Sequence, residues 1–553
     1  MITPVWWAAL LWGASWLLPI HELPWLAFHA DLLAASALAV LVGDLWRESA
    51  ALRRPPISAL LVFGLASVPL LQAAGGLIHY LGDAWMSALY LSGFALAIVC
   101  GHALATRRPE SGRAGASVLL AVALLSAVMV LRQWLQLPAP HAWWLEMPPG
   151  TRPGANVGQP NMLATLLLLG LIAALALAQS GAFGTRWLIA AAALLLAGMA
   201  ATKSRTVALG LLIVLLWLWV ARARVRLRPT VPLAIVAVFM LWAWLWPRLG
   251  PDSHLTPLRA GAPQPLGTRP IHWSSLWDAV TQAPWTGYGW NQVAVAQARS
   301  PGQAHTGEFI EHSHNLLLDL LVWNGLPLGL CVAGAIAFWL WRRSRSCSTP
   351  HATYLLAGIW GLLVHSMTEF PLDYFGFLLP LGLAVGALDA MSTPAAATVA
   401  VPRATTALVA LSAAGLTAGV TLEYTALEAD HAVMRAQWTH PELQLPDPGA
   451  VPEVRLLTQL RALLLFMRAD LGPGLNPADR AEMARVAERY GYAPVLTRLA
   501  LVESRADRPA AAEQVLLRLC RIHPQHACLD ARRRVAADAS ATAPARPAPA
   551  APG

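Results

Sequence analysis

Long runs of apolar residues recur along the whole chain and constrain its fold more than any other feature. A transmembrane helix needs roughly 20 mostly apolar residues, because the hydrocarbon core of a bilayer is about 30 Å thick. About thirteen runs approach this length, at 5–20, 25–43, 57–74, 84–105, 116–135, 161–179, 187–201, 205–220, 231–247, 315–341, 352–369, 374–391 and 404–422. Only 12% of the residues are charged, about half the share that a soluble protein carries. The sequence therefore predicts an all-α, polytopic integral membrane protein of about thirteen transmembrane helices.

Arginine clusters follow the even-numbered runs. They are Arg47, Arg53 and Arg54 after the second run, Arg107, Arg108 and Arg113 after the fourth, Arg186 after the sixth, Arg222, Arg224, Arg226 and Arg228 after the eighth, Arg342, Arg343 and Arg345 after the tenth, and Arg403 after the twelfth. Loops rich in arginine and lysine remain in the cytoplasm. The pattern predicts a cytoplasmic N-terminus, a first run retained as an anchor, and odd-to-even loops and a C-terminal part that lie outside. It also explains the formal net charge of +9 without nucleic-acid binding.

The polar segments between the runs divide the chain into regions. We predict N-terminal transmembrane helices over 1–135, a polar loop with a helix over 136–180, a core over 186–341 with an outer loop over 248–314, C-terminal transmembrane helices over 352–422, an outer helical domain over 423–535 and a disordered tail over 536–553. In the outer domain, two amphipathic segments pair across a turn at residues 507–509, which resembles a tetratricopeptide hairpin. The last segment is rich in alanine and proline, which favours disorder.

Two histidines, His312 and His314, stand directly before the tenth apolar run. They therefore lie at the mouth of a predicted membrane helix, which Ser313 or Asn315 is suited to cap. A helix N-terminus disfavours imidazolium and so favours a neutral base, whereas the glutamates nearby favour the protonated form. Besides a base, the pair is compatible with a hydrogen-bonding cap or with half of a metal site. No further cluster of histidine, cysteine or aspartate in the sequence completes such a metal site.

Eight basic residues in or beside the outer loops break the orientation pattern. They are Arg132, Arg152, Lys203, Arg205, Arg248, Arg259, Arg269 and Arg299. Lys203 and Arg205 lie between the seventh and eighth runs, and Arg269 opens an amphipathic helix that we expect to lie on the membrane over 271–281. Such side chains can simply anchor helix ends by reaching toward lipid head groups. Alternatively they form an anion site, since a guanidinium fork matches phosphate oxygens.

Other polar residues mark the ends of the outer helices. Gln159 and Asn161 lie at the start of the sixth run, where they either cap a helix or bind a sugar or an acceptor. Glu369 lies on a very short loop after the eleventh run. It is either a plain interfacial carboxylate or a group that orients a base or pairs with Arg205 or Arg269.

Four residues near the end of the chain have the spacing of a zinc site. They are Cys520, His523, His526 and Cys528. Because this part of the chain is predicted to lie outside, where disulfides are permitted, we favour a Cys520–Cys528 disulfide, or no bond, over a metal site.

Three of these segments together carry a family resemblance. They are ANVGQPNMLAT (155–165), GTRPIHWSSLWDAVTQAPWTGYGWNQ (267–292) and EFIEHSHN (308–315). In this order the chain resembles the O-antigen ligase superfamily, in the branch of bacterial pilin-type O-oligosaccharyltransferases, also called protein glycosylation ligases. The resemblance makes 136–180 a glycosylation-ligase signature region and 186–341 an O-antigen ligase-like core. It implies His314 as the catalytic base with His312 as second choice, diphosphate binding by Arg205, Arg269 and Lys203, and sugar or acceptor binding by Gln159, Asn161 and Glu369.

The resemblance also implies a reaction. Members of this branch transfer a preassembled oligosaccharide from undecaprenyl diphosphate to serine or threonine of an exported protein, often a pilin, on the periplasmic side of the inner membrane. The expected partners are the lipid-linked glycan, the acceptor protein and membrane lipids, with no nucleic acid, no metal and no cofactor. The alternatives are an O-antigen ligase that uses lipid A core as acceptor, an O-antigen polymerase, a transporter or flippase, and a scaffold that only docks partners.

Overall fold

The computed structural model describes residues 3–48, 51–139, 141–148, 151–225, 228–249, 267–300, 305–392, 397–443, 445–446, 449–471 and 475–542. Over these residues the chain is helical, apart from an isolated β-bridge between Pro56 and Thr398. Arg226, Arg259 and residues 250–266 and 301–304 of the predicted outer loop lie outside the described residues. The helical structure of the described residues confirms the predicted all-α fold class.

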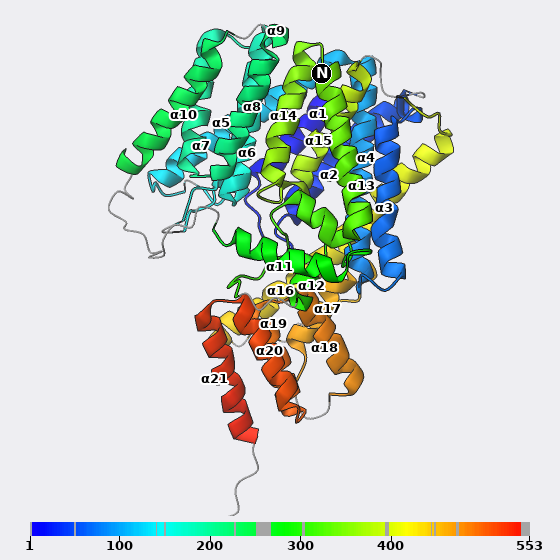
Figure 1. The fold of residues 1–553 in the computed structure, drawn as a ribbon, viewed down its shortest axis with the longest axis vertical. Helices are drawn as coiled ribbons and strands as arrows, with labels where there is room; N and C mark the ends of the chain where they lie inside the picture. The colour runs from blue at the N-terminus through cyan, green and yellow to red at the C-terminus, as the bar shows by residue number, and fades with distance from the viewer. Residues whose placement is uncertain are drawn as a thin grey trace, which may run out of the picture.

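Each of the thirteen predicted apolar runs falls on a helix (Figure 1). These helices are α1 (Pro4–Leu17), α2 (Phe28–Arg47), α3 (Ile57–Ala74), α4 (Leu81–Arg107), α5 (Gly112–Trp134), α6 (Pro160–Gln179), α7 (Thr185–Ala201), α8 (Arg205–Val220), α10 (Thr230–Leu249), α13 (Leu316–Ser346), α14 (Pro350–Ser366), α15 (Phe375–Met391) and α16 (Arg403–Thr439). Among the described residues, eight helices are long and apolar enough to cross a membrane, and α7, α8 and α15 are shorter apolar helices. The chain is therefore a polytopic membrane protein, and the count of thirteen spans stays a prediction.

The bundle is held together at close helix crossings that use small residues. Helix α4 packs along α3 and α15, α1 along α2, and α5 along α6. A Cβ atom added at Gly101 of α4 would lie 2.1 Å from the backbone oxygen of Leu383, and one at Gly386 of α15 would lie 1.9 Å from that of Ile98. Only glycine allows these two backbones to approach so closely, as is common between membrane helices.

The basic clusters on the predicted cytoplasmic side share one end of the bundle. Arg108, at the end of α4, pairs with Asp44 and Glu48 at the end of α2. The guanidinium group of Arg403, at the start of α16, lies 5.2 Å from the ring centroid of Trp46. The N-terminus and the C-terminal helices lie at opposite ends of the molecule (Figure 1). This arrangement agrees with the predicted topology, and which end faces the cytoplasm stays a prediction.

Helix α13 differs from the single span predicted over 315–341, because it is broken at Gly325 (φ 70°, ψ 180°). The break accommodates the turn that follows α11 (Arg269–Gln282). The carbonyl of Pro284 accepts from the Leu326 amide at 2.7 Å, and the Val322 carbonyl accepts from the Tyr288 amide at 2.8 Å. The turn thus takes up backbone groups that a continuous helix would have paired internally.

We expect Gly325→Ala to destabilise the fold, whereas Gly334→Ala, on the same helix, leaves stability almost unchanged. A Cβ at Gly325 would lie 2.6 Å from the carbonyl carbon of Trp285 and would occupy a positive φ, while nothing lies within 4 Å at Gly334. Backbone strain of this kind costs about 1–3 kcal/mol. Thermal unfolding of the two variants in the same detergent measures the difference. Equal unfolding temperatures would contradict the proposed packing at the break.

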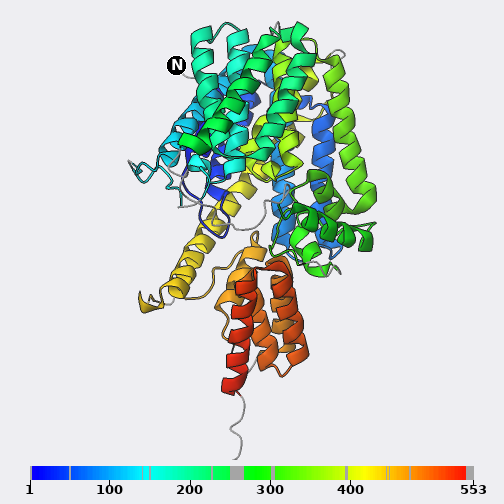
Figure 2. The same cartoon turned by 60° about the vertical axis from the view of Figure 1, so that its left-hand side comes forward.

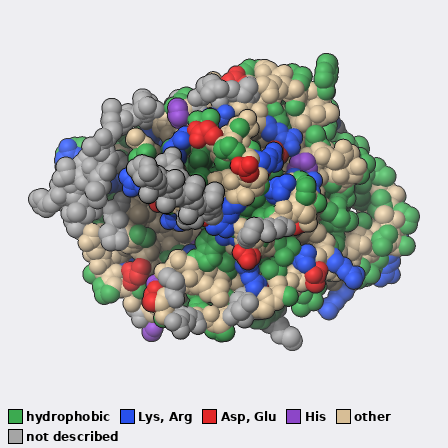
Figure 3. All heavy atoms as spheres, turned by 90° about the horizontal axis from the view of Figure 1, so that it is seen from below, with side chains coloured by type: hydrophobic (Ala, Val, Ile, Leu, Met, Phe, Trp, Pro, Cys, Tyr) green, Lys and Arg blue, Asp and Glu red, His purple; other side chains and the backbone are tan. Residues whose placement is uncertain are grey.

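The outer helical domain consists of α17 (Thr458–Arg468), α18 (Pro477–Arg489), α19 (Ala493–Arg505), α20 (Pro509–Ile522) and α21 (Gln525–Thr542). It projects from one end of the bundle (Figure 2), and its outer face carries interspersed basic and acidic side chains (Figure 3). Helices α19 and α20 pair across the predicted turn. Cys520 and Cys528 form a disulfide, as the sequence favoured.

Two predicted boundaries of this domain need correction. Helix α16 is continuous from Arg403 to Thr439 and runs through the boundary placed at 422 and 423, since it contains no proline to end it. The tail predicted to be disordered over 536–553 is helical as far as Thr542, because its first part is rich in alanine, which favours helix. Residues 543–553 lie outside the described residues.

Candidate active site

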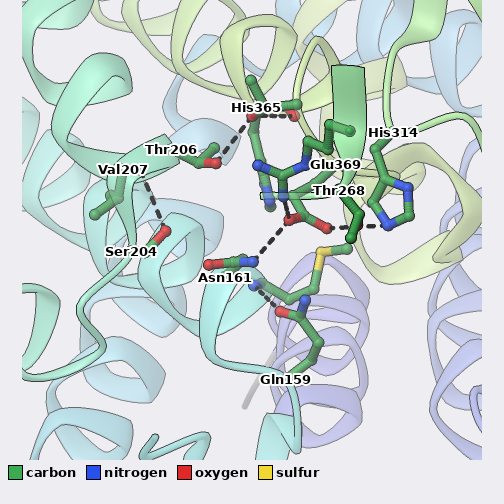
Figure 4. Close-up of polar contacts among 12 residues, drawn as sticks. Gln159, Asn161, Ser204, Thr206, Val207, Thr268, His314, His365 and Glu369 are labelled. Carbon is green, nitrogen blue, oxygen red and sulfur yellow. Dashed lines mark hydrogen bonds and ion pairs between the residues drawn. The ribbon is translucent and has the colours of Figure 1, made fainter. Parts of the chain in front are cut away.

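A buried carboxylate, Glu369, lies at the centre of the polar residues that the sequence singled out. It belongs to the short loop between α14 and α15, and its side chain is 4% exposed. Asn161 donates a hydrogen bond to its Oε1 at 2.7 Å, and the guanidinium group of Arg269 pairs with the same oxygen. The Nε2 atom of His314 lies 3.9 Å from Oε2 (Figure 4). Three separate parts of the chain thus converge on the carboxyl group of a fourth.

The local sequence positions the amide and the arginine at helix starts. Asn161 follows Pro160, which opens α6, and the side chain of Gln159 caps that helix by accepting from the Met162 amide at 2.7 Å. Arg269 is the first residue of α11. The oxygen of Gln159 is therefore occupied in capping, whereas Asn161 reaches the carboxylate.

The predicted amphipathic helix is present as α11. Its apolar residues Leu276 and Val280 are buried, and the helix packs along the first turns of α13. Trp277 of the same helix is 50% exposed. The helix therefore buries one side in protein, and this contact places Arg269 beside the loop that precedes α13.

His314 occupies a strained backbone position. Its φ is 58°, in the left-handed region that side chains other than glycine rarely adopt. The residues on both sides are fixed: Asn315 caps α13 by accepting from the Leu318 amide, and the Ser313 amide donates to Asp319 at 2.9 Å. Trp273 also donates its indole N–H to the Ser313 carbonyl at 2.9 Å. Strained residues of this kind cluster at functional sites.

The two histidines have opposite electrostatic surroundings. The Nδ1 atom of His312 lies 3.0 Å from Asp373, and its ring stacks on Phe370 at 4.5 Å between centroids. Burial opposes charge on His312, but the carboxylate of Asp373 outweighs it and raises the pKa to about 9. Burial, followed by the charges of His312 and Arg269, lowers the pKa of His314 to about 4. At neutral pH, His312 is therefore protonated and His314 is a neutral imidazole.

Glu369 combines burial with two hydrogen-bond donors. Burial raises the pKa of its carboxyl group, while Arg269 and Asn161 lower it. The carboxyl group of Glu369 therefore accepts hydrogen bonds from Arg269 and Asn161 and is shielded from solvent. It is well suited to orient the side chains around it, which is one of the two roles that the sequence left open for Glu369.

Lys203 and Arg205 lie at the edge of this cluster. Ser204 caps α8 by accepting from the Val207 amide. The hydroxyl of Thr206 lies 2.9 Å from that of Thr368, the residue before Glu369. Lys203 and Arg205 are exposed on either side of Ser204. The start of α8 therefore adjoins the carboxylate loop, with its basic side chains accessible to a ligand.

Sequence reasoning missed Asp373 and Phe370, the two residues that set the state of His312. Both lie on the loop that carries Glu369, within HSMTEFPLDY (365–374). The sequence did contain an indication of their role. A very short loop between two helices needs neither a second carboxylate nor an aromatic side chain simply to connect them.

The part of the chain that the structure describes holds no group of three or more histidine, cysteine, aspartate or glutamate side chains able to bind a metal ion. The zinc-like spacing near the C-terminus is instead explained by the Cys520–Cys528 disulfide. The site is thus built from two imidazoles, guanidinium groups, an amide and a carboxylate.

Comparison with known families and proteins shows which regions of the chain resemble them. Residues 190–333 match the O-antigen ligase family model, 153–178 match the protein glycosylation ligase model, and 353–536 match the C-terminal model of virulence-factor membrane-bound polymerases. Over these regions the chain is similar to O-antigen ligases and to protein glycosylation ligases. It is 29% identical over 404 residues, 69% of each chain, to the general O-oligosaccharyltransferase of Acinetobacter baylyi. It is also 36% identical over 115 residues, 21% of each chain, to the ComP-specific O-oligosaccharyltransferase of the same organism.

These similarities have two direct consequences. O-oligosaccharyltransferases are glycosyltransferases, so this O-antigen ligase relative is an enzyme of that class. The match to the glycosylation-ligase model includes Asn161, and the match to the O-antigen ligase model includes Arg205, Arg269 and His314. The residues that converge on Glu369 thus come from two separately matched regions.

Proposed function

We propose that this protein transfers a preassembled oligosaccharide from undecaprenyl diphosphate to serine or threonine of an exported protein such as a pilin. The observation that carries the proposal is the convergence of Arg269 and the neutral imidazole of His314 on buried Glu369. A cationic group and a base at the end of a membrane bundle suit a substrate that joins a lipid, a diphosphate and a sugar. The names of the two relatives support transfer of an oligosaccharide to a protein.

The charges of the site support the following reaction. The diphosphate binds at Arg269 with Arg205 and Lys203, whose positive charges stabilise the negative charge that develops on the leaving group. Neutral His314 takes the proton from the acceptor hydroxyl, and the hydroxyl oxygen attacks the anomeric carbon of the first sugar. The bond between that carbon and the phosphate oxygen breaks, and its electron pair leaves with undecaprenyl diphosphate. The scheme uses cationic side chains rather than a divalent ion for neutralisation.

The remaining residues of the cluster act on Arg269 and His314. Glu369 orients Arg269 and Asn161 through its Oε1 atom and faces His314 with Oε2. Burial lowers the pKa of His314 most, and the imidazolium of His312 adds to this by repulsion, so His314 stays neutral. We assign Asn161 to sugar or acceptor binding, and Gln159 to shaping the turn that presents it.

The proposal also includes the side of the membrane on which each part of the protein lies. We place the Glu369 cluster and the helical domain in the periplasm and the N-terminus in the cytoplasm of a bacterial inner membrane. The arginine pattern supports this orientation. The Cys520–Cys528 disulfide supports an oxidising compartment for the domain that contains it.

The acceptor distinguishes the proposal from its closest alternatives. The matches at 190–333 and 353–536 are also compatible with an O-antigen ligase or polymerase, whereas the match at 153–178 favours a protein acceptor. Co-expression with a lipid-linked glycan pathway and a candidate pilin tests this. We expect mass spectrometry to detect the glycan on the pilin; glycan found only on lipopolysaccharide would overturn the proposal. A transporter would instead bind its substrate near the middle of the membrane.

We expect His312→Gln to move the acidic limb of the pH–activity profile to higher pH. The positive charge of His312 helps to lower the pKa of His314 to about 4, after burial. Without it, the pKa of His314 rises, so the neutral base is lost earlier as the pH falls. The shift should reach up to about one pH unit in kcat. His440→Gln, an exposed histidine at the end of α16, is the control, and an unshifted limb would exclude this role for His312.

A further inference from the structure

The outer helical domain contacts the loop that carries the two histidines. We call residues 305–315 the histidine strap. Arg489, the last residue of α18, is buried and bonds to Asp83 on the first turn of α4 through Nε at 2.9 Å and an NH2 nitrogen at 3.1 Å. Its third nitrogen lies 3.3 Å from Glu311, the residue before His312. A single guanidinium group thus joins the outer domain, the membrane bundle and the strap.

Neighbouring contacts hold the strap along its length. The hydroxyl of Tyr492 donates to the second oxygen of Glu311 at 3.3 Å. The ring of Phe309 packs edge-on against Tyr492, with centroids 5.1 Å apart. The Gly307 amide donates to the Arg521 carbonyl at 3.1 Å, next to the Cys520–Cys528 disulfide. The outer domain therefore contacts the strap at three alternating positions before the histidines.

The other side of the strap is held by elements of the outer loop and the bundle. The side chain of Gln297, on α12 (Val293–Arg299), donates to the Glu308 carbonyl and accepts from the Ile310 amide. Between the two histidines, Ser313 is fixed by Asp319 and Trp273. His314 thus lies between an anchor supplied by the bundle and one supplied by the outer domain.

We propose that Arg489 and Tyr492 are positioning residues, which hold Glu311 so that His314 stays against Glu369 and Arg269. The effect that this positioning has on catalysis rests on the function proposed above. His314 has a strained φ of 58°, which the surrounding structure must enforce. Because a displacement of about 1 Å can cost about 100-fold in rate, loss of one anchor matters even though neither residue touches substrate. The outer domain is then part of the active-site scaffold.

Two substitutions test this without breaking the buried pair. Arg489→Gln would leave the Asp83 carboxylate without its guanidinium partner and destabilise the fold. Glu311→Gln and Tyr492→Phe instead weaken only the strap contact, and Tyr492→Phe changes no charge. Arg532→Gln, which removes a surface ion pair with Glu513 on the same domain, is the matched control. All are made in the full-length protein.

The first readout is hydrogen–deuterium exchange of the strap in the purified protein without substrate. We expect faster amide exchange over 305–315 in Glu311→Gln and Tyr492→Phe than in the wild type. In Arg532→Gln the exchange rate of the strap should be unchanged. The second readout is kinetic. We expect kcat to fall about 10- to 100-fold in Glu311→Gln and a few-fold in Tyr492→Phe, with the KM for the acceptor unchanged.

The two readouts separate the two proposals. Unchanged exchange of the strap in both variants would overturn the positioning role, whatever the kinetics. Faster exchange with unchanged kcat would also overturn it, since the strap would then be held without consequence for the reaction. A wild-type protein that transfers no glycan would instead refute the proposed function, and the exchange experiment would still decide whether Glu311 anchors the strap.

Discussion

Replacing His314 with alanine is expected to lower kcat for glycan transfer by about two to four orders of magnitude, the usual contribution of a general base. Its imidazole is neutral at working pH, and its Nε2 atom lies 3.9 Å from the carboxylate that pairs with Arg269. The measurement is the initial rate of pilin glycosylation by purified enzyme in liposomes. Donor binding should be almost unchanged, because the diphosphate is assigned to the basic side chains.

The control for this variant is a histidine of the same protein outside the cluster. His440 is exposed at the end of α16, and His440→Ala should transfer glycan at the normal rate. A normal rate for His314→Ala, with normal expression and folding, would remove His314 from the reaction. A large loss in His312→Ala with no loss in His314→Ala would exchange the roles of the two residues.

The second large effect is expected for Arg269→Ala. Loss of one group that stabilises developing negative charge costs about 100- to 1000-fold in kcat. Arg269→Lys should recover only part of the rate, because an ammonium group keeps the charge without the planar fork. Arg248→Ala is the control, since this exposed arginine lies on the indole of Trp244 at the end of α10. Turnover of each variant is measured with donor and acceptor at saturation.

The structural part of the Arg269 effect can be separated from the chemical part. Asn161 and Arg269 both donate to Oε1 of the buried Glu369 carboxylate. Arg269→Ala removes one of these two donors and leaves Asn161. Adding Glu369→Gln removes that buried charge, so thermal stability should recover in the double variant while kcat stays low. Recovery of both would show that Arg269 serves the fold and not the leaving group.

The sequence predicted the helices well because an apolar run is a local property. Each run specifies its own helix wherever it packs. The break at Gly325 was harder to predict, since it depends on a turn at Pro284, far away in the chain. Gly325 and Pro327 were visible within the run, but only the partner backbone shows why the helix stops there. Helix α16 runs through the boundary predicted at 422, because a change of composition need not end a helix.

The site was predictable in its residue types and less so in its pairings. Arg269, Glu369 and His314 were all singled out, and pairing of Glu369 with Arg269 was one of the stated options. The choice between His312 and His314 depended on Asp373 and Phe370, which only the fold brings to His312. The contact between Arg489 and Glu311 joins residues 178 positions apart, and no local pattern indicates it.

The most direct measurement uses purified protein in liposomes with an undecaprenyl-diphosphate glycan and an acceptor pilin, and follows both products by mass spectrometry. We predict that glycosylated pilin and released undecaprenyl diphosphate appear in equal amounts with the wild-type protein. Both should disappear together in His314→Ala and in Arg269→Ala. Full turnover in either variant, or transfer to lipid A core and not to the pilin, would contradict the account.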